Sequence, residues 1–213
     1  MKLCTFEIHT HVGRHRRLGA VVPSGIIDLN FACAARLAAQ GEVQTQKLAD
    51  VFLPGDMRAF LDAGPAAIKI AGETIAFCEE SGIRHGPNGE TLLYQPAEVE
   101  LLAPLPNPAS VRDFYAFEAH VKKGFEKRGE PMPAEWYQIP VYYRSSHHHI
   151  IGTCQDVLWP SFTQKFDYEL ELAAVIGKKG ANIPATEARE YIAGFTVMND
   201  FSARDIQRQE MKV

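Results

Sequence analysis

Three prolines within five residues, Pro104, Pro106 and Pro108, constrain the fold of this chain more than any other feature. A proline ring fixes φ and removes a backbone N–H, so proline is excluded from helix interiors and from central strands. The proline-rich stretch is therefore expected to separate two structured parts. With 213 residues and 46% hydrophobic content, the chain is long enough for two unequal domains. We predict a small N-terminal domain over residues 1–100 and a second domain over residues 101–213.

The first hundred residues predict a small α/β unit. Three apolar segments within residues 3–30, LCTFEI, LGAVV and GIIDLN, are typical of strands separated by Gly, Pro and Ser turn signals. Residues 31–82 favour helices, since FACAARLAAQ is rich in alanine and two later segments run from a proline to a glycine. The basic run GRHRRLG at residues 13–19 lies between the first two strands, and we interpret it as an exposed hairpin turn.

The second half combines one charged helix with several strands. FEAHVKKGFEKRGE, at residues 117–130, has the period of an amphipathic helix, which Gly129 and the prolines Pro131 and Pro133 are expected to stop. Strands are predicted at IPVYYRS, HHIIG, DVLWP, YELELAAVIG and YIAGFTVMND. We therefore predict an α+β protein in which β-structure predominates.

Composition and charge exclude several classes of function. The formal net charge of −4 argues against nucleic acid or an anionic membrane as the main partner. The N-terminus has no apolar core of the length that a signal peptide needs, and no segment approaches the apolar length of a membrane span. The four cysteines form no CxxC pair, which argues against a zinc knuckle or a redox pair and fits reduced thiols in the cytoplasm; they are Cys4, Cys33, Cys78 and Cys154.

The segment FDYELELAAVIGKK, at residues 166–179, carries an acidic residue at every second position. Side chains alternate between the two faces of a strand, so Asp167, Glu169 and Glu171 are expected to share one face. Three like charges on one face repel one another unless solvent or a cation offsets the repulsion. The spacing alone allows both a solvated face and a cation site.

Two further features favour the cation site. The apolar run AAVIG follows directly, which indicates a strand that continues into a buried sheet. In FTVMNDFSARD, an apolar strand is expected to end at Asn199 and Asp200, where site residues are commonly placed. Carboxylate oxygens are ligands suited to Mg²⁺, Mn²⁺ or Ca²⁺.

The segments DYELELAAVIGK and YIAGFTVMNDFSARDIQ closely resemble the core of the fumarylacetoacetate hydrolase family. The resemblance runs from about residue 103 to the end of the chain, and it favours the fumarylacetoacetase-like branch. It implies a small N-terminal α/β domain followed by a catalytic core of mixed β-roll or sandwich type. Family members continue beyond the position of residue 213, so the resemblance also implies a core that is incomplete at its C-terminus. The family's lysine and the acid that orients its base have no counterpart in this sequence.

The same resemblance implies a set of site residues. Glu169, Glu171 and Asp200 correspond to ligands of a divalent metal, Mg²⁺ or alternatively Mn²⁺ or Ca²⁺. Asp113 corresponds to a further acidic ligand, and Asp167 to a supporting residue beside the ligands.

Four more residues correspond to groups that act on the substrate. His120 resembles the general base, and Arg204 resembles a catalytic residue that also contacts the substrate. Tyr115 and Gln207 resemble further substrate-binding groups. No other cofactor is implied.

Three functions follow from the resemblance and are kept open. The first is a metal-dependent hydrolase that cleaves a carbon–carbon bond in a small 1,3-diketo acid such as a fumarylacetoacetate or an acylpyruvate. The second is an isomerase, hydratase or decarboxylase of 2-oxo acids. The third, of another class, is a metal-binding module without catalytic activity. The expected partners are a small diketo or 2-oxo acid and a second copy of the chain in a homodimer.

Overall fold

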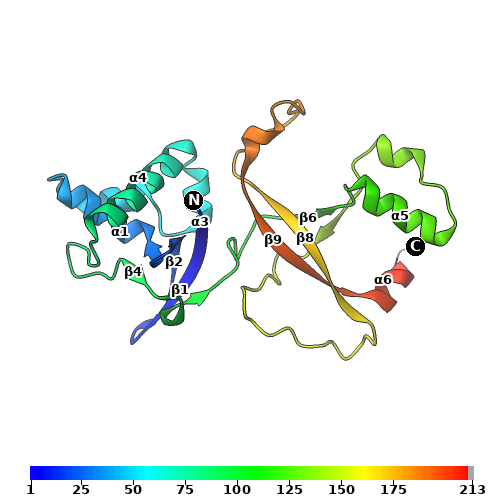
Figure 1. The fold of residues 1–213 in the computed structure, drawn as a ribbon, viewed down its shortest axis with the longest axis horizontal. Helices are drawn as coiled ribbons and strands as arrows, with labels where there is room; N and C mark the ends of the chain where they lie inside the picture. The colour runs from blue at the N-terminus through cyan, green and yellow to red at the C-terminus, as the bar shows by residue number, and fades with distance from the viewer. Residues whose placement is uncertain (211–213) are drawn as a thin grey trace. The chain divides into compact units, whose positions relative to one another are not determined.

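The computed structural model describes residues 1–210. Its N-terminal part is built around a five-stranded antiparallel sheet (Figure 1). The strand order is β4-β3-β2-β1-β5. The strands are β1 (Leu3–Thr10), β2 (Gly13–Val22), β3 (Gly25–Asp28), β4 (Leu93–Tyr94) and β5 (Glu100–Leu101), with the 3₁₀ helix η1 (Pro96–Glu98) before β5. The three predicted strands thus form the centre of this sheet.

The basic run at residues 13–19 was predicted as a turn, and this prediction is wrong. These residues belong to β2, which pairs with β1 as far as Thr10 opposite Gly13, so the turn lies at residues 11–12. Opposite charges explain the pairing, because Arg16 lies opposite Glu7 and Arg14 forms an ion pair with the same glutamate at 3.4 Å.

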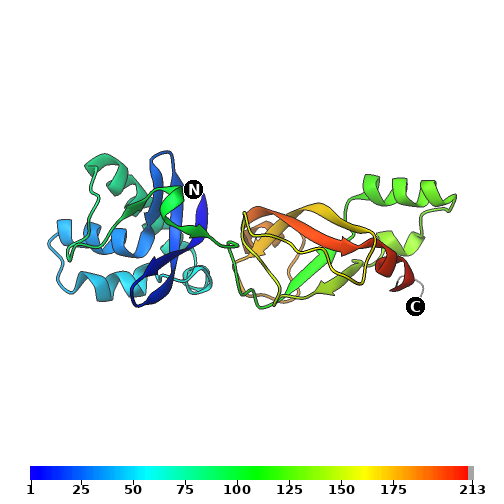
Figure 2. The same cartoon turned by 90° about the horizontal axis from the view of Figure 1, so that it is seen from below.

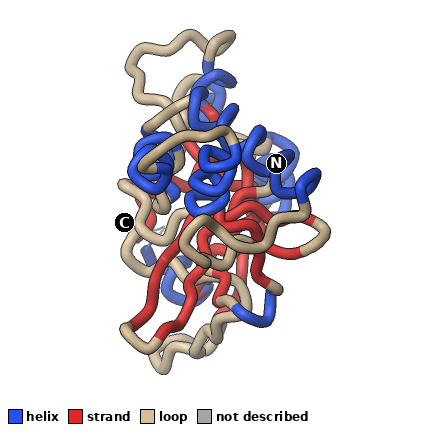
Figure 3. Tube along the Cα trace, turned by 90° about the vertical axis from the view of Figure 1, so that its left-hand side faces the viewer, coloured by secondary structure: helices blue, strands red, loops and turns tan. Residues whose placement is uncertain are grey.

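Four helices pack with this sheet and bury one hydrophobic core. They are α1 (Leu29–Ala39), α2 (Thr45–Phe52), α3 (Met57–Asp62) and α4 (Pro65–Ser81). The core joins sheet residues such as Leu18 and Ile27 to helix residues such as Leu37, Phe60 and Ala71. Figure 2 shows these helices grouped beside the sheet, and Figure 3 colours the helices and strands of the whole chain.

A buried ion pair connects the sheet to α1. The Asp28 side chain, which is fully buried, accepts hydrogen bonds from the backbone N–H groups of Asn30 and Phe31 and so caps α1. The guanidinium of Arg17 donates to both carboxylate oxygens of Asp28, at 2.6 and 3.0 Å, and lies 3.8 Å from the centre of the Phe31 ring. Burial raises the pKa of Asp28, while Arg17 and the two N–H groups act to lower it.

The second unit of the structure, residues 106–151, contains a two-stranded antiparallel sheet and one helix. The chain divides into Met1–Leu105 with Gly152–Val213 on one side and Pro106–Ile151 on the other. The elements of the second unit are β6 (Val111–Phe114), α5 (Glu118–Arg128), the 3₁₀ helix η2 (Ala134–Tyr137) and β7 (Tyr142–Ser145). Helix α5 ends at Gly129, which has a left-handed backbone (φ 71°), as the glycine stop predicted.

The strands predicted at HHIIG and DVLWP do not form. In the first segment, His149 contacts the hydroxyl of Ser146 at 3.1 Å, and just before it the His147 ring contacts the carbonyl of Pro108 at 2.9 Å. In the second, the indole N–H of Trp159 donates to the carbonyl of Thr163. Apolar runs of four or five residues are weak strand signals when no partner strand pairs with them.

The remaining elements form a long antiparallel ribbon in the first unit. They are β8 (Phe166–Ile176), the 3₁₀ helix η3 (Ala188–Tyr191), β9 (Ile192–Ala203) and α6 (Arg204–Glu210). Strand β9 does not end at Asn199 and Asp200 as predicted, because its pairing with β8 continues to Ala203 opposite Phe166.

The α+β class is confirmed, but β-structure does not predominate as expected, because helix and strand contribute roughly equal shares. The division predicted at residue 100 stays a prediction. Within residues 1–210, no helix is both long enough and apolar enough to cross a membrane.

Replacing Asp28 by Ala is expected to lower the free energy of unfolding by about 3 kcal/mol, because the change removes a helix cap and leaves the Arg17 charge without its partner. Asp56→Ala is the matched control. Asp56 also caps a helix, through Ala59, but at an exposed position, so a loss of about 1 kcal/mol is expected. Urea unfolding followed by far-UV circular dichroism measures both. Equal losses of unfolding free energy in the two variants would show that the Arg17–Asp28 ion pair adds no stability beyond that of the helix cap.

Candidate metal and substrate site

The register of the β8–β9 ribbon brings acidic residues of both strands to one face. Asp167 lies opposite Ser202, Glu169 opposite Asp200, and Glu171 opposite Met198. Directly opposite residues in an antiparallel pair share a face, so Asp200 lies beside Glu169 and diagonal to Glu171. A carboxylate oxygen of Glu171 and one of Asp200 lie within 4.8 Å of each other. Three of the predicted ligands therefore share one surface of the ribbon.

The acidic face of the ribbon is more buried than its apolar face, which is the reverse of a strand whose charged face is simply solvated. Glu169, Glu171 and Asp200 are half-buried. The apolar residues that alternate with them are exposed, for example Leu170 at 71% and Val197 at 69%. The acidic row is therefore not the more exposed face of the ribbon, as a purely solvated row would be.

Arg204 connects two of the acids. Its Nε donates to Oδ2 of Asp167 at 3.0 Å, and its Nη1 forms an ion pair with Glu169. Nη1 also lies 3.3 Å from Oε1 of Gln207, one turn further along α6. The guanidinium therefore offsets the repulsion between neighbouring carboxylates of β8.

The environment of Asp167 favours its ionised form. The backbone N–H of Tyr168 donates to the carboxylate at 2.9 Å, and together with Arg204 it lowers the pKa of Asp167 below the ordinary value. Asp167 is exposed and bound to Arg204, which fits the supporting role expected from its position.

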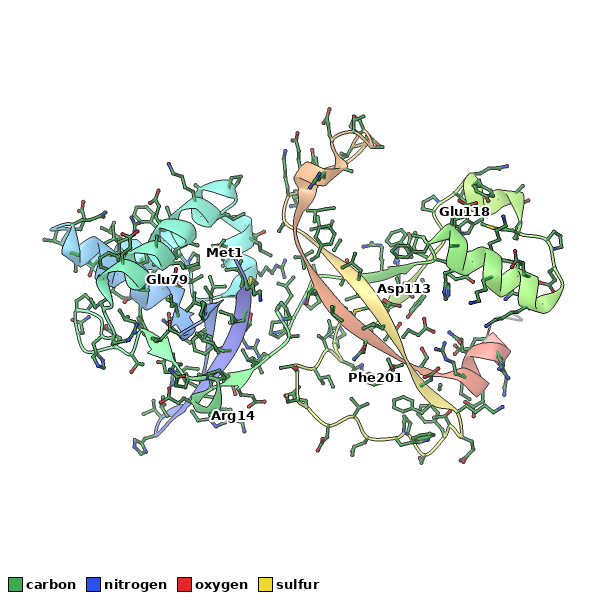
Figure 4. The ribbon with its side chains drawn as sticks, viewed as in Figure 1. Met1, Arg14, Glu79, Asp113, Glu118 and Phe201 are labelled. Carbon is green, nitrogen blue, oxygen red and sulfur yellow. The ribbon has the colours of Figure 1, made fainter. Side chains whose placement is uncertain are left out.

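The other predicted site residues belong to residues 106–151. Asp113 lies on β6 opposite Tyr143 and is half-buried (Figure 4). The backbone carbonyl of Tyr115 accepts a hydrogen bond from the Trp136 indole at 2.7 Å. The ring of Tyr115 meets the ring of His120 edge-on, with 5.7 Å between their centres. This unit thus brings the rings of Tyr115 and His120 into contact.

A second acidic group lies on the N-terminal sheet and has a simpler explanation. Glu7, His9 and Glu100 offer ligand atoms within 4.8 Å of one another. Arg14 lies 3.4 Å from Glu7 and 3.9 Å from Glu100, so a fixed positive charge already accompanies the two carboxylates. We interpret this group as an ion-pair network of paired strands.

Two residues that the sequence did not single out, Thr163 and Asp205, join α6 to the segment before β8. The carboxylate of Asp205 accepts hydrogen bonds from the hydroxyl of Thr163 and the backbone N–H of Gln164. Asp205 could have been noticed from the sequence as an acidic residue in the first turn of a helix. No local pattern indicates Thr163, which is 42 positions away in the chain.

Comparison with known proteins identifies the family. Residues 109–213 match the family model described as fumarylacetoacetate (FAA) hydrolase C-terminal. Human mitochondrial oxaloacetate tautomerase FAHD2A is 30% identical over 207 residues, which are 97% of this chain and 54% of the relative. These two matches confirm the resemblance to the fumarylacetoacetate hydrolase family that the sequence shows.

Solved structures share the fold. A fumarylacetoacetate hydrolase from Exiguobacterium antarcticum has a TM-score of 0.56 and 19% identity, with 99% of this chain and 60% of that chain covered. A maleylpyruvate hydrolase from Sphingobium sp. SYK-6, in complex with manganese(II) and pyruvate, has a TM-score of 0.51 and 18% identity, with 96% and 60% covered. The chain spans a little over half the length of the curated relatives it matches.

Arg204→Gln is expected to raise the pKa of Asp167, but to leave it below the ordinary value of about 3.9 because the Tyr168 N–H remains. A carboxylate with a lowered pKa stabilises the folded chain above the ordinary pKa, and this contribution is lost as the pH falls through the lowered value. The variant should therefore lose stability near neutral pH and differ less from the parent in acid.

Carboxyl ¹³C NMR against pH measures the Asp167 midpoint directly. The matched control is Arg208→Gln, an exposed arginine on the same helix, which should leave that midpoint unchanged. A midpoint that Arg204→Gln does not move would contradict the ion pair.

Proposed function

We propose that this chain is the metal-binding part of an enzyme that stabilises the enolate of a small 2-oxo or 1,3-diketo acid. The observation that carries the proposal is the half-buried acidic face of the β8–β9 ribbon, with Glu169 opposite Asp200 and Arg204 beside Glu169. The proposed ligands are Glu169, Glu171 and Asp200, together with Asp113 from residues 106–151.

The donor set fits a hard divalent cation. Glu171 and Asp200 each offer a carboxylate oxygen within 4.8 Å of the other, and the side chains on this face supply no thiolate. Such oxygen ligands suit Mg²⁺, Mn²⁺ or Ca²⁺. When bound, the cation would supply positive charge to a developing enolate oxygen. Because the preferences of Mg²⁺ and Mn²⁺ overlap, we propose Mg²⁺ with Mn²⁺ as a substitute.

The remaining residues would hold the substrate and move its proton. The Arg204 guanidinium, with Gln207 one turn away, can bind a substrate carboxylate or carbonyl oxygen. His120 would move the proton, because an imidazole is the side chain that most often acts as a general acid or base near neutral pH. Tyr115, edge-on to His120, would donate its hydroxyl to the substrate.

Tautomerisation and carbon–carbon hydrolysis are the two reactions we consider. Both need the enolate, and they differ in whether His120 moves a proton on the substrate carbon or takes one from an attacking water. The human relative that is 30% identical is named an oxaloacetate tautomerase, which supports the first. Asp113, which resembles the fumarylacetoacetase-like pattern, supports the second. Tautomerisation of a 2-oxo dicarboxylic acid is the reaction we favour.

Addition of Mn²⁺ is expected to raise the melting temperature of the parent chain, since binding only the folded state stabilises it. Glu171→Ala and Asp200→Ala should each weaken Mn²⁺ binding at least tenfold, because each removes one charged ligand. Isothermal titration calorimetry and thermal unfolding are the measurements. Glu187→Ala, at an exposed position between β8 and β9, is the control and should bind as the parent does. Unchanged affinity in both ligand variants would refute the site.

Replacing His120 by Ala is expected to abolish turnover while Mn²⁺ affinity stays within about twofold, because the imidazole is not among the proposed ligands. Enol–keto conversion of oxaloacetate and cleavage of acylpyruvates are both followed by ultraviolet absorbance. His148→Ala, at an exposed position, is the control.

The substrate panel separates the three functions. Conversion of oxaloacetate without cleavage supports the tautomerase, and cleavage of a diketo acid supports the hydrolase. Mn²⁺ binding by the parent without turnover of any substrate would favour the non-catalytic module.

Two further expectations complete the proposal. A homodimer in the cytoplasm is proposed, although the human relative is named as mitochondrial. The substrate is the small-molecule partner, and neither nucleic acid nor membrane is proposed.

A further inference from the structure

A small set of hydrogen bonds joins α6 to residues 163–165, the segment that leads into β8. Asp205 accepts from the Thr163 hydroxyl at 2.5 Å through Oδ1 and from the Gln164 backbone N–H at 2.9 Å through Oδ2. The Thr163 hydroxyl in turn accepts from the backbone N–H of Lys165 at 3.1 Å. Thr163 is 1% exposed, so its hydroxyl is placed where an unpaired polar group would be costly.

Arg204 is the residue next to Asp205, and it faces a different set of partners. Its backbone N–H donates to the carbonyl of Lys165 at 2.8 Å, while its side chain reaches Asp167 and Glu169 on β8. Residues 204 and 205 thus attach the start of α6 to the same short stretch of chain, one through the backbone and the other through a carboxylate.

Helix α6 depends on such contacts for its position. It has seven residues, and helices of this length are not stable by their own hydrogen bonds. The described residues of α6 are not part of a hydrophobic core. An arginine side chain has many rotamers, so its placement at one site depends on a fixed backbone.

We propose that Thr163 and Asp205 are positioning residues, whose hydrogen bond fixes the first turn of α6 so that the Arg204 guanidinium is held at Glu169 and Asp167. The inference rests on the proposed function for the role of Arg204 toward a substrate anion. The attachment itself depends only on contacts within the chain. The lowered pKa of Asp205, caused first by Thr163 and then by Gln164, fits a carboxylate that stays ionised in this contact.

Thr163→Val removes the hydroxyl and keeps the shape of the side chain, whereas Thr163→Ser keeps the hydroxyl. Asp205→Asn is the second variant, because an amide has one acceptor oxygen where the carboxylate has two, so it cannot accept from both Thr163 and Gln164. Thr196→Val, on β9, is the matched control, since within residues 1–210 its hydroxyl bonds only to a neighbouring backbone carbonyl, at 3.4 Å.

The first measurement is the ¹⁵Nε–Hε NMR signal of Arg204 in the parent chain without ligand, assigned by its absence in Arg204→Gln. Thr163→Val and Asp205→Asn should move it toward the position of a solvated arginine and speed its exchange with water roughly three- to tenfold. Thr163→Ser and Thr196→Val should leave it in place. An Arg204 signal that is unchanged in both Thr163→Val and Asp205→Asn, while their far-UV circular dichroism remains that of the parent, would overturn the proposal. If Thr163→Val does not fold, Asp205→Asn decides.

The second measurement is the affinity for pyruvate in saturating Mn²⁺. Thr163→Val should weaken it roughly three- to tenfold in the parent and have no further effect in an Arg204→Gln background, since the two changes then remove the same contact. Equal weakening in both backgrounds would overturn the positioning role. If the parent chain binds no pyruvate, the substrate part of the proposed function fails, and the NMR signal alone decides the positioning role.

Discussion

The antiparallel register of β8 and β9 is the constraint on which the candidate site depends. A strand places every second residue on one face, and the pairing of Glu169 with Asp200 puts the acids of both strands on the same face. A shift of β9 by one residue would turn Asp200 to the other face and bring Asn199 or Phe201 beside the acids of β8 in its place. The repulsion within the acidic row is offset in part by Arg204, which reaches the row from α6.

Local signals in the sequence were sufficient for the elements that local chemistry decides. The alanine-rich segment gives α1, the proline and glycine limits give α4 from Pro65 to Ser81, and the glycine stop gives the end of α5. Alternating acids were enough to place Asp167, Glu169 and Glu171 on one strand. Each of these features depends on residues that lie within a few positions of one another.

Features that depend on distant partners could not be obtained in this way. The basic run forms a strand because Glu7 and Asp28 lie opposite or beside its arginines, which its own residues do not reveal. Strand β9 passes Asp200 because β8 still provides a partner there. The ion pair between Glu169 and Arg204 joins residues 35 positions apart, and it depends on both the register and the turn into α6. The family resemblance supplied the residue types of the site, but not these contacts.

Arg204 links the chemistry of the site to its stability. In the chain alone, its charge is shared between Asp167 and Glu169, so the same guanidinium that would bind a substrate anion also makes the acidic row tolerable. A cation at Glu171 and Asp200 would add a second positive charge close to the first, and the two would compete for Glu169. A guanidinium displaced from Glu169 would still be tied to Asp167, and would then have donors available for a carboxylate. Under the proposed function, Asp167 would therefore keep Arg204 near the site while Glu169 binds the metal.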